Sequence, residues 1–187
     1  MYQLKIITST TRQGRKGHIV AKWITELATA NGNFQVELLD LAEINLPFMD
    51  EPNHPRLQQY QHEHTKRWSA KINEADAFII VLSEYNFGFP APIKNALDFL
   101  FNEWKHKPVA FVSYGGISGG LRSTQMLKQV VTALNMMPVV ESVAIPFFNQ
   151  YINDEEEFHP DEKVEKSAHG MFTELLRWAE TLKPMRQ

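Results

Sequence analysis

The sequence predicts an α/β fold built on a parallel sheet, and three observations carry that prediction. Five strand-like segments alternate with helical patterns along the chain, which is the order expected of strand–helix–strand units. One segment, Ala77–Leu82, is a continuous apolar run, as expected for a central parallel strand covered on both faces. A length of 187 residues, with 43% hydrophobic and 22% charged residues, is typical of one globular domain. We therefore expect residues 1–187 to form a single domain.

In the first half of the chain, strands and helices are predicted to alternate twice. Tyr2–Thr8 is rich in aliphatic residues and is expected to be a strand. Apolar residues then recur at helical spacing from 18 to 28, and the Asn-Gly-Asn sequence at 31–33 ends that helix. Phe34–Leu41 is predicted to be the second strand. After a proline-bearing loop, Arg56–Ala75 is predicted to be a polar helix with its apolar side facing the sheet.

The second half continues the alternation after the apolar run. A Pro-Ala-Pro sequence opens a helix predicted over residues 90–104, since proline is tolerated in a first turn. Pro108–Ser113 is the fourth predicted strand, and Leu121–Leu134 is the helix that follows its glycine-rich loop. Pro138–Ile145 is the fifth predicted strand, and Asp161–Leu182 is the closing helix.

Charge and composition exclude several classes of protein. With 19 Lys and Arg against 22 Asp and Glu, the net charge is −3, so no broad basic surface for nucleic acid is expected. No apolar run approaches the roughly 20 residues that span a bilayer, and the start lacks the features of a secretory signal. The absence of cysteine excludes disulfides and thiolate chemistry, and His62 and His64 lie two apart on a predicted helix, which disfavours a metal site. We expect a cytoplasmic protein that binds neither membranes nor metals.

The loop after the first strand, Ser9–His18, has the composition of an anion site. It leads into a helix N-terminus, where free backbone N–H groups and the helix dipole favour negative charge. Hydroxyl groups, Arg12 and two further cations add donors suited to a small phosphate. The alternative is a solvated turn capped by Ser or Thr. Neither a Walker A loop nor a G-x-G-x-x-G sequence is present.

The loop after the third strand, Ser83–Pro90, contains three aromatic residues within five positions. Aromatic faces and backbone amides at the end of a strand suit a flat heterocycle with polar edges. The alternative is a packed loop whose aromatic side chains fill the local core. That alternative accounts for Phe89 better than for 85–88, where Asn and Gly indicate special backbone angles.

The loop after the fourth strand, Ser113–Gly120, contains four glycines and a formal G-x-S-x-G match centred on Ser118. Asp154 or Asp161, followed by His159 or His169, even preserves the Ser, Asp, His order of a hydrolase. However, Ser118 follows four extra loop residues instead of a sharp turn at the end of the strand, which disfavours a nucleophile. The other interpretation is that the glycines let the backbone lie close to a flat ligand or to the first loop.

These three loops together resemble one protein family. The segments are STTRQGR at 9–15, EYNFGFP at 84–90 with IKNALD at 93–98, and SYGGxSGG at 113–120. They resemble the NADPH-dependent FMN reductase family, whose members include quinone, azo-dye and chromate reductases, and the resemblance covers about residues 2–145. It implies a flavodoxin-like fold, a doubly wound five-stranded parallel sheet of order 2-1-3-4-5. Ser9 and Ser83 depart from the family pattern, which usually has Gly and Pro there.

The resemblance implies bound FMN and assigns its contacts residue by residue. The phosphate is expected at Thr10, Arg12, Arg15 and His18. The ribityl chain and isoalloxazine ring are expected beside Glu84, Tyr85, Asn86 and Phe87, with Ser113, Tyr114, Gly115 and Gly116 meeting the ring from the other side.

The implied activity is that of an NAD(P)H oxidoreductase that works by a ping-pong cycle. NAD(P)H serves as co-substrate and reduces the flavin, which then reduces a small acceptor such as a quinone or azo compound. No side chain need act as acid or base, so Glu84 is expected to serve through its backbone or as a solvated carboxylate. A flavodoxin-like electron carrier is the main alternative, although a net charge of −3 is mild for an acidic docking face.

The resemblance also implies a homodimer or homotetramer with the flavin near the interface. Phe99, Phe101 and Trp104 are candidates for that interface. The alternative is that Phe99 and Trp104 are core residues.

Overall fold

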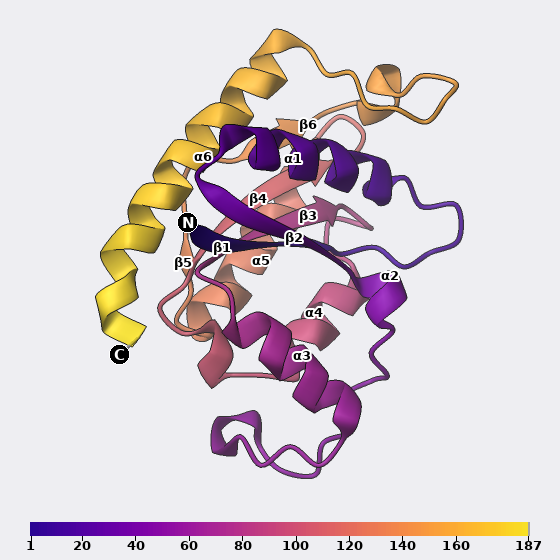
Figure 1. Cartoon of the computed structure of the whole chain (residues 1–187). Coiled ribbons are helices and arrows are strands. Elements are labelled where there is room, and N and C mark those ends of the chain that lie inside the picture. The colour runs from indigo at the N-terminus through magenta and orange to yellow at the C-terminus, as the bar shows by residue number, and fades with distance from the viewer. Residues whose placement is uncertain (187) are drawn as a thin grey trace.

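A computed structural model describes residues 1–186, which form a single sheet covered by helices (Figure 1). The strands are β1 (Tyr2–Thr8), β2 (Phe34–Asp40), β3 (Ala77–Ser83), β4 (Pro108–Tyr114), β5 (Met137–Pro138) and β6 (Val143–Ile145). The α-helices are α1 (Gly17–Asn31), α2 (Leu41–Ile44), α3 (Glu63–Asn73), α4 (Ala91–Asp98), α5 (Leu121–Ala133) and α6 (Glu162–Leu182). Short 3₁₀ turns are η1 (Pro55–Leu57), η2 (Asn102–Trp104), η3 (Phe148–Tyr151) and η4 (Lys183–Arg186).

The sheet is parallel, and its strand order is β2-β1-β3-β4-β5, with β6 also paired to β4. This order confirms the predicted flavodoxin-like topology. The register places Thr8 beside both Asp40 and Val81, and Ser83 beside Tyr114. The carboxyl ends of β1, β3 and β4 therefore meet at one edge, so the three unusual loops leave the sheet together.

Helices cover the two faces of the sheet in separate layers. Helices α1 and α6 pack on one face, and α3, α4 and α5 pack on the other (Figure 1). Every residue of β3 is buried, as the continuous apolar run predicts. Alternate side chains of each central strand enter the two cores, so Ile79 packs with α1 while Ile80 packs with α3 and α4.

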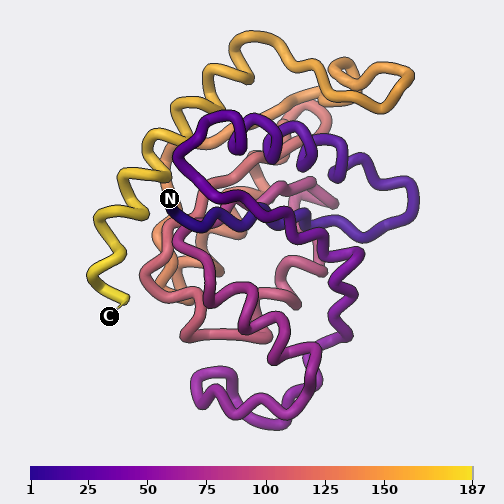
Figure 2. The backbone as a smooth tube through the Cα atoms, in the orientation of Figure 1, coloured from indigo at the N-terminus to yellow at the C-terminus, as the bar shows by residue number. Residues whose placement is uncertain are grey.

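The predicted helix over 56–75 is wrong at its beginning, because α3 starts only at Glu63. The preceding segment makes the turn η1 and then a loop at one end of the molecule (Figure 2). The carboxylate of Glu51 accepts hydrogen bonds from the backbone N–H groups of Gln61 and His62, at 2.7 and 3.0 Å. These contacts hold the loop and leave α3 to begin after it.

The predicted helix over 90–104 is also too long, since α4 ends at Asp98. Two buried indoles satisfy carbonyls of its last turn: Trp68 Nε1 donates to Ala96 at 2.9 Å and Trp104 Nε1 to Leu97 at 3.1 Å. Trp104 and Phe99 are both 0% exposed, so they are core residues and the interface alternative is wrong for them.

The fifth predicted strand, Pro138–Ile145, is interrupted. Residues 137–138 and 143–145 pair with β4, but residues 139–142 separate them. Pro138 has no N–H to donate, and Val140 turns outward with 81% of its surface exposed. The position of this strand in the sheet is as predicted, but its continuity is not.

Candidate functional site

A cavity of 340 Å³ lies at the carboxyl edge of the sheet, where the three loops meet. Its walls come from all three loops and from the segment after β6. They comprise Arg12, Gly14, Arg15, Lys16, Ser83, Glu84, Tyr85, Tyr114, Gly115, Phe148 and Asn149. The topology therefore brings together segments more than 100 residues apart, at the place where open α/β sheets bind ligands.

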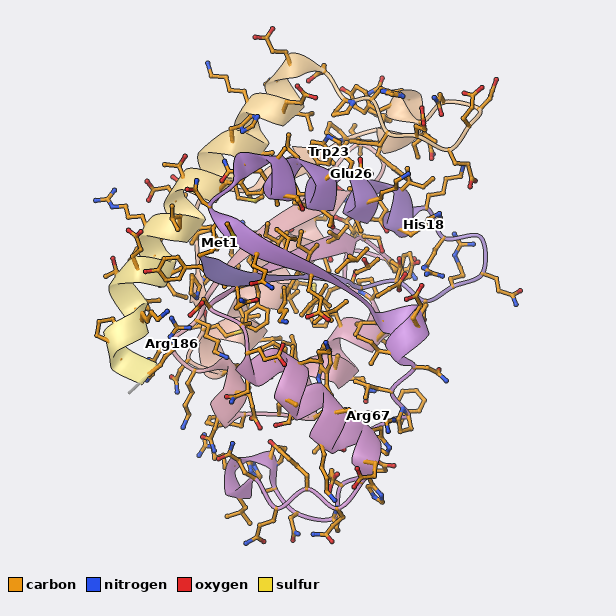
Figure 3. All side chains as sticks on the ribbon, viewed as in Figure 1. Met1, His18, Trp23, Glu26, Arg67 and Arg186 are labelled. Carbon is orange, nitrogen blue, oxygen red and sulfur yellow. The ribbon has the colours of Figure 1, made fainter. Side chains whose placement is uncertain are left out.

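The first loop presents cations and an open helix end. Arg12 is exposed, and within residues 1–186 its guanidinium bonds only to the carbonyl of Gln13, at 3.1 Å. Arg15 is already engaged, because its Nη2 lies 2.5 Å from the Asp40 carboxylate, while its Nε has no partner among the described residues. No side chain in the described part of the chain caps the N-terminus of α1, and His18 lies exposed on its first turn (Figure 3). Donors for an anion are thus available here.

Gly17 is the point of closest contact between the first loop and β4. A Cβ atom at Gly17 would collide with the hydroxyl of Tyr114 and lie 2.7 Å from Thr10 Oγ1. The Tyr114 ring is 4% exposed, and its burial raises the pKa of the phenol. Thr10 Oγ1 and Tyr114 Oη lie 3.5 Å apart, so these two predicted site residues meet, and the phenol supports the first loop.

The second loop makes a tight, strained turn. Tyr85 and Gly88 exchange two backbone hydrogen bonds of 2.9 Å, and φ is +51° at Asn86 and +70° at Phe87. Two positive φ angles define a type I′ turn, in which a side chain as large as Phe costs about 1–2 kcal/mol. Tyr85 is 42% and Phe87 64% exposed, so these rings do not fill a core. Only Phe89 packs inward, as the packed-loop alternative required.

The third loop carries no hydrolase arrangement. The hydroxyl of Ser118 donates to the Glu84 carboxylate at 2.8 Å, and the nearest partners of His159 are Asn153 and Glu157. The hydroxyl of Ser113 donates to the Gly119 carbonyl at 2.8 Å. The serine-hydrolase interpretation is therefore wrong.

Glycines shape the same loop. Gly115 lies against the backbone of Gly120, with 3.3 Å between the position of a Cβ atom and the Gly120 nitrogen. At Gly116 such an atom would meet nothing within 4 Å, so this stretch of backbone is open to a ligand. Gly120 has a φ of +80°, the left-handed region in which glycine is favoured.

Glu84 differs from expectation, because its side chain is 9% exposed and therefore not a solvated carboxylate. It accepts hydrogen bonds from Ser118, from the backbone N–H of Arg122 and from the Arg122 guanidinium. Burial acts to raise the pKa of Glu84, but Arg122 and Ser118 outweigh it and hold the pKa below its usual value. Glu84 is thus an ionised link between two loops and not a proton donor.

Buried polar atoms without partners gather at this edge. Among the described residues, four of the six such side-chain atoms belong to Thr8, Ser9, Arg15 and Ser83. Buried polar groups in proteins are normally hydrogen-bonded, so unpartnered atoms at this edge favour a polar ligand there. Arg15 and Ser83 line the cavity, whereas Thr8 and Ser9 are buried at the end of β1. A phosphorylated ligand with a hydroxylated chain fits the donors that line the cavity, and FMN is such a ligand. Of the two departures from the family pattern, only Ser83 adds a hydroxyl group to the lining among the described residues.

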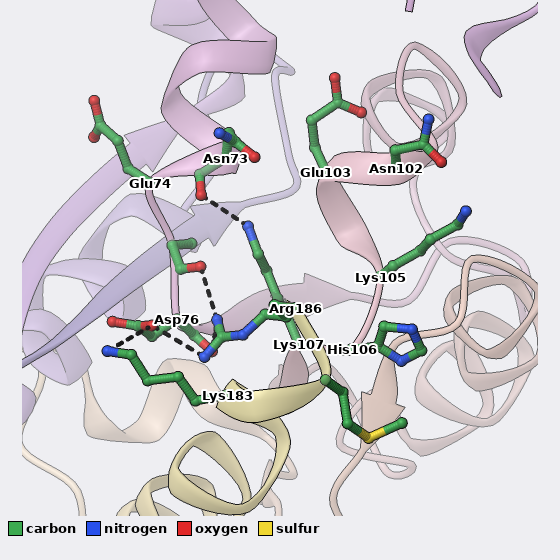
Figure 4. Close-up of a pocket in the computed structure, with 12 residues that line it drawn as sticks. Asn73, Glu74, Asp76, Asn102, Glu103, Lys105, His106, Lys107, Lys183 and Arg186 are labelled. Carbon is green, nitrogen blue, oxygen red and sulfur yellow. Dashed lines mark hydrogen bonds and ion pairs between the residues drawn. The ribbon is translucent and has the colours of Figure 1, made fainter. Parts of the chain in front are cut away.

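A second cavity, of 530 Å³, lies at the amino edge of the sheet (Figure 4). Its most buried charged groups make structural contacts. The buried ammonium of Lys107 donates to the carbonyls of Ile72 and Asn73, at 2.8 and 3.0 Å. Arg186 pairs with Asp76 at 3.1 Å. These contacts tie the segment after α3 to the turn η4.

The parallel sheet has the strand order of flavodoxin-like proteins. At its carboxyl edge, a loop with donors for an anion lies beside an exposed aromatic turn, and this combination is typical of a flavodoxin-like flavoprotein. The sequence profile of the NADPH-dependent FMN reductase family matches residues 3–150. The chain belongs to this family, and it is an NAD(P)H-dependent oxidoreductase that uses FMN and reduces small acceptors.

Individual relatives agree with this assignment. An NAD(P)H-dependent FMN reductase of Schizosaccharomyces pombe is 35% identical over 189 residues, covering 97% of this chain and 94% of the relative. An NADPH:quinone oxidoreductase of Arabidopsis thaliana is 45% identical over 69 residues, or 35% of each chain. The solved structure of FerB, a flavoenzyme NAD(P)H:(acceptor) oxidoreductase from Paracoccus denitrificans, superposes with a TM-score of 0.79 at 23% identity, covering 97% of this chain and 98% of that one. That likeness shows the shared fold.

Sequence reasoning missed the residues that organise the site from outside the three loops. Arg122 binds Glu84 from the first turn of α5, Asp40 binds Arg15 from the end of β2, and Phe148 walls the cavity after β6. Asp40 could have been found from the sequence, since it ends β2, the strand next to β1, and β1 leads into the first loop. No sequence signal distinguishes Arg122 from other exposed helical residues, or Phe148 from other half-buried aromatic residues.

Proposed function

We propose that FMN binds in the carboxyl-edge cavity, with its phosphate at the first loop and its isoalloxazine ring between the second and third loops. The observation that carries this placement is the group of unpartnered buried polar atoms at the ends of β1 and β3. An uncapped α1 and a free Arg12 lie next to it, as a phosphate requires.

The first-loop residues differ in what they can offer the phosphate. Arg12 donates only from Nη1, to the Gln13 carbonyl among the described residues, so the rest of its guanidinium can supply the strongest contact. Arg15 is less available, because its Nη2 donates to Asp40, although its Nε has no partner among the described residues. His18 is exposed beside the free amides of the first turn of α1. Thr10 is buried under the loop beside Tyr114 and acts mainly by fixing the loop.

The second and third loops hold the ring. FMN, when bound, accepts a hydride from NAD(P)H and then passes two electrons to a small acceptor. In this proposal Asn86 and Phe87, at the tip of the Tyr85–Gly88 turn, would hold the ring from one side, and the open backbone at Gly115 and Gly116 would hold it from the other. Glu84 is ionised and bound to Arg122, so it supplies no proton.

Quinones and azo compounds are the proposed acceptors, in a ping-pong cycle in which acceptor and nicotinamide use the same exposed side of the ring. Quinones are favoured by the name of the Arabidopsis relative. A cytoplasmic location fits an enzyme that draws on NAD(P)H. Among residues 1–186, no helix has the length and apolarity needed to cross a membrane.

A homodimer or homotetramer is also proposed. Exposed apolar side chains surround the cavity, and an isolated subunit would leave them in water: Tyr85, Phe87, Ile117, Leu121 and Phe147. Sedimentation of the FMN-loaded protein over a range of concentrations tests this, and a monomer throughout would contradict it.

Anaerobic stopped-flow mixing of the FMN-loaded protein with NADPH tests the activity. Rapid bleaching of the flavin, followed by recovery on adding a quinone and no ternary-complex kinetics, is expected. Flavin that binds but does not bleach with either NADPH or NADH would favour an electron carrier instead. Failure of the full-length protein to bind FMN would contradict the proposed placement.

A further inference from the structure

The second loop is tied to helix α5 by an unusual cap. The first turn of α5 follows Gly120, which has no side chain with which to cap it. Glu84 supplies the cap from another loop, since its Oε2 accepts from the backbone N–H of Arg122 at 3.2 Å. The same oxygen accepts from Ser118 at 2.8 Å. A carboxylate is favoured at a helix N-terminus, so this contact holds the second loop against α5.

The side chain of Arg122 closes the link. Its Nη1 donates to Glu84 Oε1 at 2.8 Å, and its guanidinium carbon lies 4.3 Å from the centre of the Phe87 ring. One arginine therefore engages two residues of the same loop, three positions apart. A flat guanidinium can bind a carboxylate at its edge and an aromatic ring at its face, whereas an ammonium cannot do both equally well.

Neighbouring contacts show that this part of α5 serves as a platform for the turn. The hydroxyl of Ser123 donates to the carbonyl of Ser83 at 2.8 Å, at the end of β3. The sulfur of Met126 lies 4.0 Å from the position of a Cβ atom at Gly88, at the other end of the turn. The first turns of α5 thus contact the second loop at both ends and across its tip.

We propose that Arg122 is a positioning residue for the flavin: by binding Glu84 and covering Phe87, it holds the strained Asn86–Phe87 turn in the conformation against which the isoalloxazine ring packs. Phe87 is 64% exposed and has a left-handed backbone, so little else retains its ring. Without Arg122 the turn relaxes, and the flavin loses a preformed wall. This inference rests on the proposed placement of FMN between the second and third loops.

Three substitutions separate the contributions of the side chain. Arg122→Ala removes the ion pair and the cover over Phe87, Arg122→Met keeps an apolar stem over the ring, and Arg122→Lys keeps the charge. FMN is titrated into each FMN-free full-length protein while flavin fluorescence is followed. We expect the Kd for FMN to rise roughly tenfold in Arg122→Ala and by smaller factors in the other two.

Circular dichroism of the bound flavin, recorded in the visible region at saturating FMN, distinguishes positioning from general stabilisation. Arg122→Ala should change the sign or intensity of these bands, because the ring packs against a different wall. Arg177→Ala is the matched control, since Arg177 also pairs with a glutamate on a helix, at 3.5 Å, but far from the site. It should leave both the Kd and the spectrum unchanged.

A double-mutant cycle tests the role of strain. In Phe87→Gly the turn adopts positive φ without cost and the ring that Arg122 covers is gone. The effect of Arg122→Ala on the Kd should therefore fall to about twofold in that background. If the wild type binds FMN but Arg122→Ala and Arg122→Met bind it within twofold of wild type, with unchanged flavin bands, the positioning role is wrong. Failure of the wild type to bind FMN would instead contradict the proposed function.

Discussion

The two cavities at opposite edges of the sheet show that size does not identify a binding site. The amino-edge cavity is the larger, at 530 Å³ against 340 Å³, and both contain several cations. At the amino edge, Lys107 donates to backbone carbonyls and Arg186 pairs with Asp76. At the carboxyl edge, Arg12 bonds only to the carbonyl of its neighbour Gln13 within residues 1–186, and the hydroxyl groups of Thr8 and Ser9 have no partner there. A ligand site is marked by the groups that the chain leaves unsatisfied.

The largest expected effect is at the carboxyl edge, in Gly17→Ala. The new methyl group would collide with the Tyr114 hydroxyl and displace the phosphate loop, at a cost of about 3 kcal/mol in FMN binding, or roughly 150-fold in Kd. Titration with FMN measures this. Gly170→Ala is the control, because a methyl group there meets nothing within 4 Å, and it should leave the Kd unchanged. Equal affinities in the two variants would contradict the close contact at Gly17.

Arg12→Ala comes next. It should remove a charge-assisted hydrogen bond to phosphate worth about 1.5–3 kcal/mol, which is roughly 10- to 150-fold in Kd. Because Arg12 is exposed and bonds only to Gln13, the free energy of unfolding of the FMN-free protein should change by less than about 0.5 kcal/mol. Calorimetric titration and denaturant unfolding measure the two quantities. An unchanged affinity would remove Arg12 from the phosphate site.

Lys107→Met, at the amino-edge cavity, should change the free energy of unfolding and leave the Kd for FMN unchanged, the reverse of Arg12→Ala. Burial, aided by the charge of Arg186, lowers the pKa of Lys107 to about 8, below the 10.5 of the unfolded chain. Between these values the unfolded state binds more protons, so this lysine makes the wild type more stable as pH rises. The variant lacks that gain and should lose about 3 kcal/mol relative to wild type between pH 7 and 10.5.

Denaturant unfolding at several pH values checks this expectation. The difference between the two proteins, and not either curve alone, reports Lys107, because other groups titrate in both. A constant difference across the range would contradict the buried charge. A change in FMN affinity would contradict the contrast between the two edges.

The smallest expected effect is that of Ser118→Ala. It removes one of the hydrogen bonds to Glu84, which costs about 1 kcal/mol, or roughly fivefold in the Kd for FMN. NADPH-dependent quinone reduction at saturating FMN should persist, since the hydroxyl is a link and not a nucleophile. Steady-state assays measure this, and abolished turnover at full FMN occupancy would indicate a direct role for Ser118.

The sequence predicts the sheet well because the strands carry local signals. The continuous apolar run of β3 and the glycine-rich loop after β4 each specify their element within a few residues. The errors arise where distant residues decide. Glu51 holds the segment before α3 as a loop, and Trp68 and Trp104 take the last carbonyls of α4. These partners lie 7 to 28 residues away in the sequence, so the spacing of apolar residues in a helix does not reveal them.

The site follows the same division. Its position could be predicted, because the ends of β1, β3 and β4 share one edge, and the exposed Tyr85 and Phe87 agree with a ligand-binding turn. The environment of Glu84 could not be predicted, since its partner Arg122 is 38 residues away and its sequence context does not distinguish it from other arginines on helices. The composition of a loop can reveal residues that contact a ligand directly. It does not reveal the residues that hold those contact residues in place.

The interruption between β5 and β6 has a consequence for how copies of this chain can meet. A continuous outer strand would present a row of free N–H and C=O groups that another polypeptide could extend. Here the row is broken after Pro138 and resumes only at Val143, so this margin of the sheet is a poor template for growth by strand addition. Any assembly on this side must be built through side chains, which favours closed, reversible complexes over fibrils.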